Sequence, residues 1–124
     1  MHTDITERIN KYHDKENPMK KLQVEINAFI KERNWEKFHS PKNLAMALTV
    51  ETAELLEIFQ WMTAEESSAP SPKTLEHIEE EIGDVMIYLS TIAASLGLDP
   101  IRAAQKKLLL NAEKYPVKAG NNQD

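Results

Sequence analysis

The chain has 124 residues, a formal net charge of −5 and no cysteine. That length supports one domain with its own hydrophobic core, and the lack of cysteine excludes disulfides and thiolate metal sites. The acidic charge disfavours nucleic acid as a partner. No apolar run approaches the roughly 20 residues that span a bilayer, and no signal-peptide core is present. We therefore expect a cytoplasmic protein that binds neither membrane nor nucleic acid, and the scarcity of glycine indicates an all-helical fold.

The first segment, residues 1–17, is polar and carries few apolar residues at helical spacing. We expect it to form a short helix or an arm that lies on a partner. Asn17-Pro18 marks a boundary, because the residue before proline avoids helical backbone angles. A single domain is expected over residues 18–116, followed by a disordered tail over residues 117–124.

Four helices are expected in this domain, and three of them begin with a capping residue followed by proline. The start signals are Ser40-Pro41, Ser71-Pro72 and Asp99-Pro100, and the expected helices cover residues 18–33, 41–62, 72–96 and 100–115. A flexible loop is expected between the second and the third. Consecutive helices with short connections pack against each other in opposite directions. We therefore predict an all-α protomer built as an antiparallel four-helix bundle.

The connector NWEKFHS, residues 34–40, is unusually rich in rings, with Trp35, Phe38 and His39. One interpretation is a structural staple in which the rings cap the hydrophobic core. The other is a stacking wall for a planar ligand. The connector alone leaves both interpretations open.

The stretch LAMALTVETAELLEIFQWM, residues 44–62, reads as one helix with a carboxylate inside its apolar stripe. Apolar residues recur at spacings of three and four, and Glu51 fills the gap between Leu48 and Leu55. Glu54 follows on the same side of the helix. Burying an unpaired carboxylate costs several kcal/mol. The pattern therefore predicts that Glu51 is paired with a cation.

The next helix carries a second acidic pair, Glu81 and Asp84, beside its own apolar stripe, and Tyr88 continues the row one turn on. If the two helices pack antiparallel, the four carboxylates meet, and they would repel one another without divalent cations among them. Hard oxygen ligands without histidine or cysteine favour Mg²⁺, Mn²⁺ or Ca²⁺ over Zn²⁺. The competing interpretation is that these acids are ordinary solvated helix surface.

The last helix places Lys107 and Asn111 along the border of its inward stripe, which ends at Tyr115. A lysine and an amide beside an acidic metal site could hold phosphate and sugar groups, although taken alone they also fit an ordinary surface. Leu109 and Leu110 point away from this stripe. Apolar residues there indicate burial against another subunit.

Several of these segments together resemble one known family, the MazG-like all-α nucleoside triphosphate pyrophosphohydrolases, and within it the dCTP pyrophosphatase-like branch. The resemblance covers roughly residues 26–116. It rests on the ExxE and ExxD pairs, on FHSPKN and FQW around the first pair, on DVMIYLS after the second, and on KLLLNAEKYP near the end. Two spaced acid pairs combined with these flanking segments are highly specific.

The resemblance implies Mg²⁺-dependent hydrolysis of a (deoxy)nucleoside triphosphate to the monophosphate and pyrophosphate, with Mn²⁺ as an alternative ion. It also implies assembly as a dimer or as a tetramer of two dimers, with the site completed across a subunit interface. The implied metal ligands are Glu51, Glu54, Glu81 and Asp84, and either Glu51 or Glu54 is the catalytic base. The implied substrate-binding residues are Trp35, His39 and Trp61 around the nucleotide, Tyr88 near the metals, and Lys107, Asn111 and Tyr115 on phosphate and sugar.

One position departs from the family's pattern and leaves the preferred base open. Ile26 stands where a histidine near the base is expected, so use of several dNTPs is as plausible as strict use of dCTP. A sister enzyme acting on dUTP or phosphoribosyl-ATP and a non-catalytic helical interaction module are the alternatives. A di-iron carboxylate protein is disfavoured, because it needs ExxH motifs on two helices. The one ExxH of this chain, Glu36 to His39, lies before the proline that starts the second helix.

Overall fold

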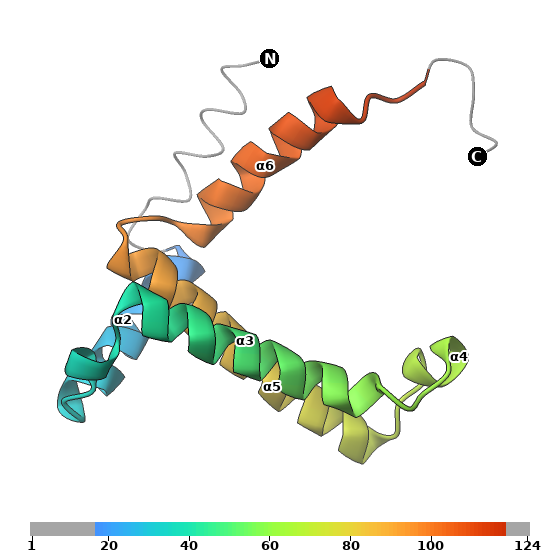
Figure 1. Ribbon diagram of the computed structural model, residues 1–124, viewed down its shortest axis with the longest axis horizontal. Coiled ribbons are helices and arrows are strands. Elements are labelled where there is room, and N and C mark those ends of the chain that lie inside the picture. Colours follow the sequence, from blue (N-terminus) through green and yellow to red (C-terminus); the bar gives the residue numbers. More distant parts are fainter. Residues whose placement is uncertain (1–16, 119–124) are drawn as a thin grey trace.

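The computed structural model describes residues 17–118, and these form helices connected by short turns (Figure 1). The elements are α2 (Pro18–Glu32), the 3-10 turn η1 (Glu36–Phe38), α3 (Pro41–Phe59), α4 (Ala64–Ser67), α5 (Pro72–Ser95) and α6 (Pro100–Lys114). No strand occurs in residues 17–118, so the all-α prediction is confirmed. The N-terminal arm and most of the C-terminal tail lie outside the described residues.

Each long helix begins where a side chain caps its first free backbone N–H groups and proline occupies the first turn. Asn17 Oδ1 accepts a hydrogen bond from the Met19 N–H at 2.9 Å. Ser40, Ser71 and Asp99 cap α3, α5 and α6 in the same way. The three predicted start signals are therefore confirmed.

The connection between α3 and α5 contains a short helix, α4, where a flexible loop was expected. Thr63 and Glu66 form a reciprocal capping box, in which each side chain accepts a hydrogen bond from the other residue's backbone N–H. This pair satisfies two free donors at once and orders the segment. α3 itself ends at Phe59, three residues before the expected end.

The centre of the fold is an antiparallel pair, α3 and α5, which lie side by side along most of their length (Figure 1). α2 packs across the C-terminal half of α5, where Gln23 donates a hydrogen bond to the Ser90 carbonyl and the Ser90 hydroxyl contacts Met19. The buried apolar side chains of this core are Met19, Ile26, Ile30, Leu44, Ile78 and Ala93. The core is therefore concentrated where these three helices meet.

The fourth helix does not close a bundle within one chain, which corrects the prediction of a four-helix bundle protomer. α6 leaves α5 at 90° and points away from the α3–α5 pair (Figure 1). The chain turns at Gly97, whose φ of 69° is readily adopted only by glycine, and α6 restarts at Asp99. Among the described residues no single helix is long and apolar enough to cross a membrane, and only the bent pair of α5 and α6 meets that test by length and composition.

Large apolar side chains remain exposed on all four long helices. Outside α2 they include Met46, Val50 and Leu56 on α3, Leu75, Ile82, Met86, Ile87 and Leu89 on α5, and Leu108, Leu109 and Leu110 on α6. Monomeric proteins rarely expose this much apolar surface without a partner. The three consecutive leucines of α6 face different directions around the helix, so more than one neighbour is needed to cover them. Burial of these surfaces against further copies of the chain stays a prediction.

Replacing Leu110, which is 57% exposed, by glutamate tests this prediction. A charge inside an apolar interface is costly to bury, so we expect Leu110→Glu to reduce the mass in solution to that of one chain. Size-exclusion chromatography with light scattering measures the mass. Lys118→Glu, which alters an exposed residue beyond α6, should leave the assembly unchanged. A wild-type chain that is already monomeric would contradict the prediction.

Candidate metal centre and ring-lined pocket

Carboxylates from the two central helices meet at one point. Oxygen atoms of Glu51 on α3 and of Glu81 and Asp84 on α5 all lie within 4.8 Å of one another. Glu54, three residues after Glu51 on α3, lies close enough to raise the pKa of both Glu51 and Glu81. Residues three apart share one face of a helix, and the antiparallel packing of α3 and α5 turns the two acidic faces toward each other. We call these four residues the acid cluster.

The acid cluster is electrostatically unfavourable without a cation. Burial raises the pKa of Glu51 to about 7, and its hydrogen bond with Glu54 and the charges of Glu54, Asp84 and Glu81 act in the same direction. Burial and the charges of Glu54 and Asp84 also raise the pKa of Glu81. The raised pKa values of Glu51 and Glu81 favour their protonated forms where a metal ion is absent.

The atoms of the cluster fit a hard divalent cation. Glu51 Oε2 and Glu81 Oε2 are buried and have no hydrogen-bond partner, although buried polar atoms normally have one. Within residues 17–118 this is the one group of acidic or imidazole side chains arranged to hold a metal ion. Its oxygen-only donor set is the kind that Mg²⁺, Mn²⁺ and Ca²⁺ prefer.

A pocket of about 360 Å³ opens beside the acid cluster and shares Asp84 with it. One wall comes from α2 and the other from α5, and the connector after α2 closes one end. The lining residues are Leu22, Glu25, Ile26, Phe29, Ile30, Trp35, His39, Asp84, Ile87, Tyr88 and Thr91. Three of the predicted substrate residues, Trp35, His39 and Tyr88, are therefore brought together next to the acids.

The rings at this pocket are held by local contacts. Trp35 and Phe29 pack edge to face with their centroids 5.7 Å apart, and the Arg33 guanidinium lies 3.5 Å from the centre of the Phe29 ring. Asn34 adopts a left-handed conformation with φ of 55°, and the next N–H, that of Trp35, then bonds to the Ile30 carbonyl. The tight turn thus points Trp35 back along α2.

Two features of the pocket bear on what it can bind. His39 Nδ1 is buried without a hydrogen-bond partner, so an imidazole nitrogen is available to a ligand. Phe29 was expected in the core, yet it is 48% exposed and lines the pocket. Its helical spacing could not reveal this, because the apolar face of α2 is divided between the core and the pocket.

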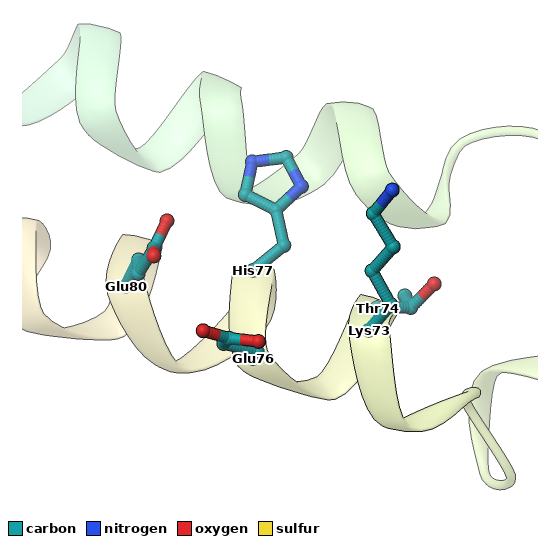
Figure 2. Close-up of a pocket in the computed structure, with 5 residues that line it drawn as sticks. All are labelled: Lys73, Thr74, Glu76, His77 and Glu80. Carbon is teal, nitrogen blue, oxygen red and sulfur yellow. The ribbon is translucent and has the colours of Figure 1, made fainter.

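A second hollow, of about 520 Å³, lies on the other side of the acid cluster and is lined by Glu54, Glu57, Ile58, Gln60, Met62, Thr74, His77 and Glu81. Thr74 and His77 also line a neighbouring hollow with Lys73, Glu76 and Glu80 (Figure 2). His77 Nε2 lies 3.5 Å from Glu81 Oε1. Sequence patterns gave no sign of His77, because a single histidine on a charged helix face is unremarkable.

The remaining predicted substrate residues are not brought to the acid cluster within one chain. Trp61 is 89% exposed in the turn after α3. Lys107 and Asn111 lie on α6 and Tyr115 directly follows it, and α6 points away from the α3–α5 pair (Figure 1). None of these four residues lines the pocket or the hollow beside the cluster. Within one chain α6 does not border the acids, and a role for these four residues beside the cluster stays a prediction.

Comparisons with known proteins identify relatives of this chain. Residues 46–124 match the model of the MazG-like family. Over 91 residues the chain is 44% identical to dCTP pyrophosphatase 1 of Rattus norvegicus and 42% identical to that of Homo sapiens, covering 72% of this chain and 54% of each relative. The chain thus spans about half the length of these curated relatives.

The fold also matches a solved structure. A pyrophosphatase from Archaeoglobus fulgidus DSM 4304 is 40% identical, with a TM-score of 0.71, covering 80% of this chain and 93% of the other. The matched family model covers both acidic pairs and most of α3, α5 and α6. The chain belongs to the MazG-like family.

Proposed function

We propose that the chain hydrolyses a (deoxy)nucleoside triphosphate, dCTP or several dNTPs, to the monophosphate and pyrophosphate. The observation that supports this most directly is the contact between the acid cluster and the ring-lined pocket through Asp84. A planar base can stack in the pocket while its phosphates reach the acids. Relatives named dCTP pyrophosphatase 1 and a neighbour named as a pyrophosphatase support the same reaction class.

In this proposal the acid cluster holds Mg²⁺, or Mn²⁺ in its place. The bound ion supplies positive charge for the triphosphate and lowers the pKa of a coordinated water. The buried, unpartnered oxygens of Glu51 and Glu81 are the donors best placed to bind it. Glu51 or Glu54 would take the proton of the attacking water, since both are carboxylates of the acid cluster.

The ring-lined pocket would hold the base and sugar. Trp35 offers a stacking face, and the free nitrogen of His39 and the hydroxyl of Tyr88 offer hydrogen bonds. Ile26 is buried in the pocket wall and can neither donate nor accept a hydrogen bond. A binding site rejects a wrong base effectively only when that base would leave polar groups of the site without hydrogen-bond partners. We therefore expect limited discrimination among bases.

A second copy of the chain would complete the site. Across an interface in a dimer or a tetramer of two dimers, Trp61 would help to enclose the base. The residues that would contact phosphate and sugar are Lys107, Asn111 and Tyr115. The exposed leucines of α6 and the apolar faces of α3 and α5 support such an assembly. We place this activity in the cytoplasm, where it would control or clean the nucleotide pool.

A substrate screen tests the proposal against its alternatives. We expect pyrophosphate release with Mg²⁺ from dCTP and at least one other dNTP, with rates within about 10-fold, because an apolar pocket wall discriminates weakly. The assay measures pyrophosphate from each of the eight common NTPs and dNTPs, from dUTP and from phosphoribosyl-ATP. Exclusive use of dUTP or phosphoribosyl-ATP would identify a sister enzyme, and no release from any substrate would indicate a non-catalytic module.

Replacing Glu51 by glutamine should lower kcat by at least about 100-fold, because groups acting at the reacting centre contribute that much or more. The helical circular dichroism signal should be retained, since the amide has the same shape and carries no charge to bury. Glu79→Gln changes an exposed residue of α5 outside the cluster and should leave kcat unchanged. Normal turnover by Glu51→Gln would refute the proposed site.

The raised pKa of Glu51 predicts how stability depends on pH without metal. Because its pKa is near 7 in the folded chain against an ordinary value of 4.5, the folded state binds this proton more tightly than the unfolded state. Its stabilising contribution is complete below pH 4.5 and is lost as the pH rises through about 7. In EDTA the Tm of the wild-type chain should therefore fall relative to that of Glu51→Gln between about pH 5 and pH 8.

Mg²⁺ should reverse this loss. Metal and protons compete for the same carboxylates, so Mg²⁺ should raise the wild-type Tm more at pH 8 than at pH 5. Thermal unfolding followed by circular dichroism measures both effects. A Tm difference between the two proteins that stays constant across this pH range would contradict the assignment.

A further inference from the structure

His77 stands one helical turn before Glu81 on α5, so the two side chains lie on the same side of the helix. The His77 Nε2 and Glu81 Oε1 atoms are 3.5 Å apart. The His77 side chain is 56% exposed, whereas that of Glu81 is only 11% exposed. Figure 2 shows the imidazole rising from α5 toward α3, between the side chains of Glu80 and Lys73. His77 thus contacts the acid cluster from its solvent side.

The two oxygens of Glu81 have different surroundings. Oε1 has the imidazole of His77 beside it. Oε2 is buried and has no hydrogen-bond partner, although Glu81 contributes an oxygen to the group that lies within 4.8 Å of Glu51 and Asp84. A contact at one oxygen fixes the rotation of the carboxylate and therefore the direction of the other.

We propose that His77 is a positioning residue that holds Glu81 Oε1 through its Nε2–H and thereby directs Glu81 toward a divalent cation in the acid cluster. This inference rests on the proposed metal site. Groups that hydrogen-bond to a metal ligand orient it and tune its affinity for the metal. His77 is the one cationic or imidazole side chain of the described residues that is paired with a member of the cluster in this structure.

The competing explanation is an ordinary exposed pair that has no bearing on the cluster. Lys73 offers a matched comparison, because it lies one turn earlier on α5 and lines the same hollow as His77. A nonspecific effect of positive charge on the acids would be lost with Lys73 as well as with His77. An orienting contact would be lost only with His77.

The test measures binding of Mn²⁺ to the full chain by electron paramagnetic resonance of the free ion, with Mg²⁺ as competitor. Lys73→Ala, measured alongside, controls for the loss of a positive charge beside the acids. His77→Ala should weaken Mn²⁺ binding by about 10-fold, the lower end of the effect of such supporting contacts. His77→Gln keeps a donor near the position of Nε2 and should bind within about threefold of wild type, as should Lys73→Ala.

The outcomes separate this inference from the proposed function. Unchanged binding by His77→Ala, or equal weakening by His77→Ala and Lys73→Ala, overturns the positioning role. Glu81→Gln is measured alongside: if it loses Mn²⁺ while His77→Ala does not, the metal site stands and only the role of His77 fails. A wild-type chain that binds no Mn²⁺ overturns both. Helical circular dichroism of each variant checks that it folds.

Discussion

Repulsion among four carboxylates at one point of the α3–α5 interface is the constraint on which the rest of the structure depends. The two helices could pack more stably with apolar residues at these positions, because buried acids lose hydration and oppose one another. The raised pKa of Glu51 and of Glu81 is the direct sign of that cost. Proteins commonly tolerate buried acids of this kind, and the stability that they cost, at functional sites.

The acid cluster lies between two different surroundings, an apolar pocket and a polar hollow. On one side, α2 and its connector form a mostly apolar pocket with rings. Toward the end of the helix pair that leads into α4, a polar hollow lined by His77 lies beside Glu54 and Glu81. The acids can therefore be reached from both sides, which a cluster serving only to specify the fold would not require. A ligand with an apolar end and a highly charged end suits this arrangement, since each end then meets the surroundings it prefers.

What could be predicted from the sequence was set by short-range rules. Ser40, Ser71 and Asp99 marked helix starts because a cap and a proline act within one turn. The meeting of Glu51 with Glu81 followed from i, i+3 spacing and from the short connection between two helices. The direction of α6 could not be predicted in this way, because it depends on the backbone at Gly97 and on apolar faces that no part of the described chain covers. The position of Phe29 was missed for a similar reason: the stripe of α2 is apolar toward both the core and the pocket.

If the acid cluster acts on a triphosphate as proposed, the direction of α6 would link assembly to chemistry. A triphosphate approaching the acid cluster brings more negative charge to a point that already holds four acids, so cations must come from a bound metal and from basic side chains. Among the described residues His77 is the imidazole paired with the cluster, and it is engaged with Glu81. Lys107 lies on a helix that points away, and its neighbours Leu108 and Leu109 are exposed. If the cluster acts on phosphates as proposed, the surface that would recruit a second copy is the same surface that carries this lysine. Apolar burial along α6 would then determine both the number of chains in the assembly and the charge balance of each site.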